Sequence, residues 1–95
     1  MDSNNVVILH YDDEAMRFKT ISEFKNSLTN GGEIVIEWNG VEYGIFRKGN
    51  RFFIGHDSPD TNVFYDSPDE LLEYHVGVDR LRDVITKVAV IDRFL

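Results

Sequence analysis

The stretch EIVIEWNGVEYGIFRKGNRFFIGH, residues 33–56, constrains the fold more than any other part of the chain. Asn39-Gly40 is a dipeptide that two-residue type I′ hairpin turns favour, because both central residues need positive φ. Gly49-Asn50 offers a second two-residue turn. Apolar and polar residues alternate on both sides of each turn, which is typical of half-buried strands. The stretch therefore predicts a three-stranded antiparallel meander.

The two turns also predict the register of the meander, and the register separates its faces. Ile34 should lie opposite Ile45, and Ile45 opposite Ile54. One face is then a predicted core face, which comprises Ile34, Ile36, Trp38, Val41, Tyr43, Ile45, Phe52 and Ile54.

The second face of the meander is predicted to carry an apolar patch of Val35, Phe46 and Phe53 beside the facing pair Gly44 and Gly55. A solvated sheet face does not need these side chains, because exposed apolar patches on monomers are usually small. We expect this face to be covered by the N-terminal segment, by a second subunit or by a partner.

Short helices are predicted before and after the meander in the sequence. Thr20 and Glu23 have capping-box spacing at the start of a helix over 20–29. Ser67, Pro68 and Glu70 give the same signal for a helix over 67–75, in which Leu71, Leu72 and His75 are expected to face inward. Asp79 is a predicted cap for a third helix over 80–87.

Three further segments are predicted to be extended. Residues 5–11 and 88–91 are rich in β-branched side chains, and each is a candidate edge strand. Residues 63–65 are a candidate short strand or an aromatic plug in the core. The predicted fold is one α+β domain over residues 1–95, with a three-stranded antiparallel meander, about three short helices and residues 1–19 as an N-terminal extension.

The acidic residues are unevenly placed. The formal charge is −7, from 17 acidic and 10 basic residues, and residues 52–79 contain no Lys or Arg. The acidic residues of that tract are Asp57, Asp60, Asp66, Asp69, Glu70, Glu73 and Asp79. The remaining acids and bases balance, so this tract accounts for the whole net charge. The negative electrostatic field of this tract should repel nucleic acid and attract basic protein surfaces. The alternative interpretation is that the tract simply keeps the chain soluble.

Composition excludes several classes of protein. The chain has no cysteine, which excludes disulfide scaffolds and thiolate metal sites and is typical of a reducing cytoplasm. We expect a cytoplasmic protein, because the N-terminus lacks the features of a signal peptide and no apolar run is long enough to cross a membrane.

The candidate catalytic and ligand-binding residues are a pair of glutamates and three histidines. Glu37 and Glu42 should face each other across the first hairpin, but no nucleophile accompanies them. His10, His56 and His75 are dispersed, so we expect no metal site. No phosphate-binding loop is present. We therefore predict no enzymatic activity and no cofactor.

Basic and aromatic residues also meet at the second hairpin turn. Arg47, Lys48 and Arg51 flank Phe46, Phe52 and Phe53 there. The cluster indicates either a small nucleic-acid patch or a charged hairpin end that prevents edge-to-edge pairing. The overall charge favours the second interpretation.

From about Ile21 to Arg93 the chain resembles a group of small uncharacterised proteins of Gram-positive bacteria and their phages and mobile elements. The residues that carry the resemblance are Glu23-Phe24, Trp38-Asn39-Gly40, Tyr43, Phe64 to Leu72 and Leu81 to Ile85. The group implies no activity and no functional residue. Its genomic setting implies an anti-defence role, and in size and acidity the chain is also similar to anti-CRISPR proteins.

We expect a non-enzymatic inhibitor that binds a partner protein with a basic surface, such as a nucleic-acid-binding effector, by imitating nucleic acid. The predicted partner-binding residues are Asp57, Asp60, Asp66, Asp69, Glu70 and Glu73. We expect no direct contact with nucleic acid or a membrane. The alternative is a homodimer or other oligomer that buries Val35, Phe46 and Phe53.

Overall fold

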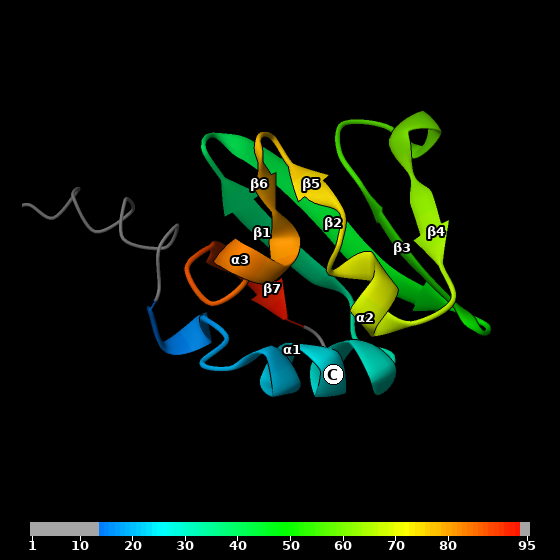
Figure 1. Cartoon of the computed structure of the whole chain (residues 1–95), viewed down its shortest axis with the longest axis horizontal. Helices are drawn as coiled ribbons and strands as arrows, with labels where there is room; N and C mark the ends of the chain where they lie inside the picture. The colour runs from blue at the N-terminus through cyan, green and yellow to red at the C-terminus, as the bar shows by residue number, and fades with distance from the viewer. Residues whose placement is uncertain (1–13, 94–95) are drawn as a thin grey trace, which may run out of the picture.

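The computed structural model describes residues 14–93 and confirms the α+β class. Five strands form one antiparallel sheet in the order β4-β3-β2-β1-β7 (Figure 1). Their bounds are Ile34–Trp38 for β1, Val41–Lys48 for β2, Arg51–Gly55 for β3, Val63–Tyr65 for β4 and Ala89–Arg93 for β7. The three-stranded meander is thus the centre of a wider sheet.

The other elements are short. The helices are α1 (Ile21–Thr29), α2 (Pro68–Leu71) and α3 (Leu81–Val84), and two 3₁₀ turns are η2 (Glu14–Met16) and η3 (Pro59–Thr61). β5 (His75–Val76) and β6 (Asp79–Arg80) pair as a small separate hairpin.

The predicted register of the meander is confirmed at every pair. Ile34 lies opposite Ile45, and Ile45 opposite Ile54. Asn39 and Gly40 have φ of 53° and 82°, as a type I′ turn requires. The turn residues and the alternation of apolar side chains therefore act together to place one set of side chains on each face.

Two edge strands complete the sheet. β4 pairs with β3 and confirms the short strand predicted over 63–65. β7 pairs with β1 and shows that the C-terminal candidate is an edge strand. The other candidate, residues 5–11, lies outside the described residues.

The core lies between one face of the sheet and the helices. α1, α2, α3 and the β5–β6 hairpin are on the same side of the sheet in Figure 1. Their buried side chains, including Phe24, Leu28, Leu71 and Leu81, join the predicted core face of the meander. The predicted burial is wrong for one residue of the core face. Val41 is 37% exposed, because it directly follows the turn at the end of the sheet.

The capping signal of α1 is confirmed. The Thr20 hydroxyl accepts a hydrogen bond from the backbone N–H of Glu23 at 3.0 Å. The Glu23 carboxylate accepts from the N–H of Lys19 at 2.6 Å, one residue before the cap. Arg93 of β7 donates to the same carboxylate at 3.0 Å, so this cap also fastens the helix to the edge of the sheet.

The region after residue 66 differs from the prediction. Ser67 caps α2 as expected, but the helix ends at Leu71, and His75 is exposed in β5 instead of facing inward. Asp79 does not cap a helix, because it lies in β6 and accepts a hydrogen bond from the Trp38 indole at 2.9 Å. Gly77, with φ of 72°, lies in the turn of the β5–β6 hairpin, which takes up residues 75–80 in place of the end of the second predicted helix and the start of the third. The third helix, α3, also ends early, at Val84.

Candidate binding face

The second face of the sheet, which carries Val35, Phe46 and Phe53, is the candidate functional site, and we call it the open face. None of α1, α2 and α3 lies on it (Figure 1). Val35, Phe46 and Phe53 are half-buried there, and pairing of β4 adds Phe64, which is 50% exposed. Sequence analysis placed the first three on this face but did not include Phe64, although its alternation with Val63 and Tyr65 is the signal that could have located it.

The three phenylalanines form a row across β2, β3 and β4. The rings of Phe46 and Phe53 are stacked with centroids 5.0 Å apart, and the centroids of Phe53 and Phe64 are 5.9 Å apart. The guanidinium of Arg51 lies 4.3 Å from the Phe64 ring centroid. The three rings therefore form an apolar strip across three of the five strands, with the Arg51 guanidinium at its β4 end.

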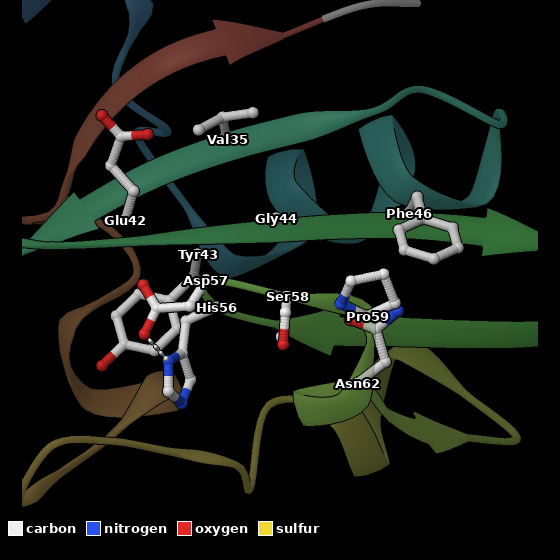
Figure 2. A pocket seen from close by; sticks show the side chains of 11 residues that line it. Val35, Glu42, Tyr43, Gly44, Phe46, His56, Asp57, Ser58, Pro59 and Asn62 are labelled. Carbon is white, nitrogen blue, oxygen red and sulfur yellow. Dashed lines mark hydrogen bonds and ion pairs between the residues drawn. The ribbon is translucent and has the colours of Figure 1, made fainter.

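A hollow of about 460 Å³ lies beside this row, and we call it the Gly44 hollow. Figure 2 shows Gly44 in the middle, Phe46 towards one end, and Glu42 with His56 and Asp57 towards the other. The other lining residues are Val35, Tyr43, Gly55, Ser58, Pro59 and Asn62. The hollow thus has an apolar floor and carboxylates at one end only.

The wall of the hollow formed by η3 depends on Gly55. A Cβ at Gly55 would lie 2.1 Å from the Asn62 side-chain oxygen and 3.0 Å from the Asn62 Cα. The turn can pack against the end of β3 only because that Cβ is absent. The Thr61 hydroxyl secures it by accepting from the backbone N–H of His56 at 2.8 Å and donating to the His56 carbonyl.

His56 and Asp57 form a contact at the acidic end of the hollow. Nδ1 of His56 is 3.1 Å from the Asp57 carboxylate, and Asp57 has a positive φ of 65°, which Asp tolerates better than most residues. Burial raises the pKa of the nearby Tyr43 phenol, and the negative charge of Asp57 raises it further. Glu37 faces Glu42 across the hairpin, as predicted.

The predicted acidic tract divides into two groups. In the first, Asp69 is 3.0 Å from the Lys25 ammonium, and Glu73 accepts from Arg82 at 2.9 Å and Arg80 at 3.0 Å. These hydrogen bonds lower the pKa of the Glu73 carboxyl.

Glu70 belongs to the same group, because its carboxylate accepts from the backbone N–H of Asp66 and completes the cap of α2. The carboxylates of these three acids therefore already have partners within the chain itself.

The second group is exposed at the β4 edge of the sheet, with Asp57 and Asp60 towards one end of β4 and Asp66 after its other end. Asp57 follows β3, Asp60 lies in η3, and Asp66 follows β4. Within residues 14–93, Asp57 contacts only His56, and Asp60 and Asp66 form no side-chain ion pair. The structure does not bring the six predicted residues into one row, since Asp57 and Asp60 lie before β4, whereas Asp66 follows β4 and lies beside the residues of α2.

The basic residues at the second hairpin turn also have two different environments. Arg47 donates to the carbonyls of Gly49 and Thr29 and fastens the turn to α1. Lys48 and Arg51 face each other across the turn, on the same face as Phe46 and Phe53. This face therefore carries two cations near the second hairpin turn, and Glu37 and Glu42 at the opposite end of the strands.

The described residues were also compared with the requirements of a metal site and of a membrane-spanning helix. Over the described part of the chain, no three His, Asp or Glu side chains gather into a group that could hold a metal ion. No described helix has the length and apolar character needed to span a bilayer.

Comparison with family models, curated proteins and solved structures gave no match. The functional argument therefore rests on the residues of the open face and of the β4 edge.

Proposed function

We propose that this protein is a non-enzymatic binding module for a partner with a basic surface. The observation that supports it is the group Asp57, Asp60 and Asp66, which are exposed beside an apolar sheet face that no described helix covers and are not neutralised by described cations. Carboxylates at the rim steer a basic partner, and apolar rings within the patch supply contact area.

The expected class of partner is a nucleic-acid-binding effector, since the surface that such a protein offers to phosphates would attract the same carboxylates. The resemblance to proteins of phages and mobile elements supports an inhibitory, anti-defence role in the cytoplasm. The proposed inhibitor would imitate nucleic acid with the three carboxylates of the β4 edge, and not with all six of the predicted partner-binding residues.

Affinity capture from a Gram-positive bacterial lysate tests this proposal. The bait is wild type, the triple variant Asp57→Asn, Asp60→Asn, Asp66→Asn, or the control Asp69→Asn, Glu70→Gln, Glu73→Gln, which changes the charge equally. We expect wild type and the folded control to recover a basic protein at low salt, and the first triple variant to lose it. Equal recovery by all three baits would contradict the proposal.

The alternative function is self-association through Val35, Phe46 and Phe53. The specific observation in its favour is that the open face has Lys48 and Arg51 at one end and Glu37 and Glu42 at the other. A two-fold arrangement of two copies, face to face, would place each acidic end against a basic end. Sedimentation velocity decides between a monomer and this dimer.

A further inference from the structure

The glycine at position 44 is not explained by the fold. Gly44 lies inside β2, where glycine weakens a strand, and it is not among the glycines with positive φ. A Cβ at Gly44 would meet no atom within 4 Å, so packing among the described residues does not exclude a side chain. Glycine inside a strand often marks a place where a ligand approaches the backbone closely.

We propose that the Gly44 hollow binds an arginine side chain presented by an extended segment of the partner protein. This inference rests on the proposed function, and it names the part of the partner that the open face recognises. The carboxylates of Glu42 and Asp57 would bind the guanidinium, while the aliphatic stem would lie over Gly44.

The shape of the hollow fits a long unbranched side chain. Gly44 is two residues from Glu42 and two from Phe46 on the same strand, so about 7 Å of strand separates the floor from each end. Val35 and Phe46 border the floor on the β1 and β2 side, and Pro59 and Asn62 of the η3 region border it on the other. Methylene groups can contact these apolar walls while a charged head reaches the far end.

The charge of the hollow selects a cation. Both carboxylates at its acidic end are exposed, and within residues 14–93 Glu42 has no ion-pair partner and Asp57 contacts only His56. They come from different elements, β2 and the turn after β3, and Figure 2 shows their side chains on opposite sides of the end of β2, so the exposed Glu42 side chain would turn towards Asp57 to share a bound group. A guanidinium has five donors in a planar fork and can serve two carboxylates at once, whereas an ammonium is a compact point charge.

The test is an NMR titration of the ¹⁵N-labelled protein with N-acetyl-arginine-N′-methylamide. The matched control ligand is the citrulline analogue, which has nearly the same shape and no charge. We expect saturable shifts at the amides of Gly44, Gly55 and Asp57 with the arginine compound, and at least tenfold weaker binding of the citrulline compound. Equal binding of the two compounds, or arginine-induced shifts away from the hollow, would overturn the inference.

Two variants remove the site in different ways. Gly44→Val places a side chain into open space and should fill the hollow without unfolding the sheet, and Glu42→Gln with Asp57→Asn removes the charge. Each should reduce affinity for the arginine compound at least tenfold. Glu33→Gln with Asp92→Asn removes two carboxylates outside the lining of the hollow and should leave affinity within a factor of about two. Unchanged binding in Gly44→Val would refute the inference.

Capture of the partner separates this inference from the function on which it rests. If Gly44→Val recovers the basic protein as well as wild type does, while the Asp57, Asp60, Asp66 triple variant loses it, the arginine site is wrong and the proposed function stands. If arginine binds the hollow but no bait recovers a basic protein in a charge-dependent way, the proposed function fails and the arginine site stands.

Discussion

At the scale of single residues, two glycines that face each other in the sheet have opposite roles. Gly44 and Gly55 are directly paired across β2 and β3. A Cβ would be free at Gly44 but would meet both the side chain and the backbone of Asn62 at Gly55. The first glycine keeps a hollow open, and the second lets η3 close one side of it.

Alanine substitution should therefore separate the two glycines. Gly44→Ala should raise the free energy of unfolding by about 0.5 kcal/mol, because alanine is favoured over glycine in a strand. Gly55→Ala should lower it by about 1–3 kcal/mol, because the turn must move to make room. Urea unfolding of both variants measures this, and a loss of stability in Gly44→Ala would contradict the account of the hollow.

Glu73 makes the stability of the chain depend on pH. Hydrogen bonds from Arg82 and Arg80 hold the pKa of its carboxyl below the ordinary value in the folded state. A group of this kind contributes stability above its unfolded pKa and loses that contribution as the pH falls through the folded pKa.

Glu73→Gln should accordingly reduce the fall in stability between neutral pH and about pH 3, as urea unfolding at each pH would show. Asp66→Asn is the control, because Asp66 has no ion pair within the described residues. If the two variants have the same pH profile, the Glu73 ion pairs do not contribute to the acid dependence.

At the scale of elements, α1 depends on its cap. Thr20→Ala removes the hydroxyl that accepts from the Glu23 N–H and should cost about 1 kcal/mol of unfolding free energy. Thr29→Ala, at the other end of the same helix, should change it by less than about 0.5 kcal/mol. Thermal unfolding of both variants measures the difference, and similar values would show that the cap is unimportant.

The elements that sequence analysis located correctly are those with strong local signals. The Asn39-Gly40 turn, the alternation of its flanks and the Thr20 cap each act within a few residues, so the register of β1 to β3 and the position of α1 could be predicted. Residues 88–91, which lie mostly in β7, were one of two candidate edge strands. The choice between them was open, because β-branched residues indicate a strand but not the strand with which it pairs.

The elements that sequence analysis missed depend on distant contacts. Asp79 has the residue type of a helix cap, yet the Trp38 indole, 41 positions away, binds it within a two-residue strand. Residue pattern likewise gave no reason to expect the hollow, since Asn62 and Gly55 meet only when η3 folds back onto β3. The acidic tract was visible in the sequence, but its division into two groups depends on which arginines and lysines approach it.

At the scale of the whole molecule, the open face can be partnered by another protein or by a second copy. The third cover predicted from the sequence, the N-terminal segment, lies largely outside the described residues. The proposed function predicts a monomer at concentrations of about 100 μM, because the exposed carboxylates of a strongly acidic chain favour a basic partner over a second acidic copy. A concentration-dependent dimer in sedimentation velocity that is lost in Phe53→Ser would instead support the alternative. Val63→Ser, at a half-exposed position on the opposite face of β4, is the control for a general loss of apolar surface.

The most direct test of the proposed function is calorimetric titration of the captured basic partner, purified, with wild type and with the Asp57, Asp60, Asp66 triple variant at low and high salt. We predict that the wild-type Kd rises at least tenfold with salt, and that the triple variant binds weakly at both concentrations, because screening and charge removal eliminate the same attraction. A Kd that is independent of salt and equal for both proteins would contradict the claim that these carboxylates bind the partner.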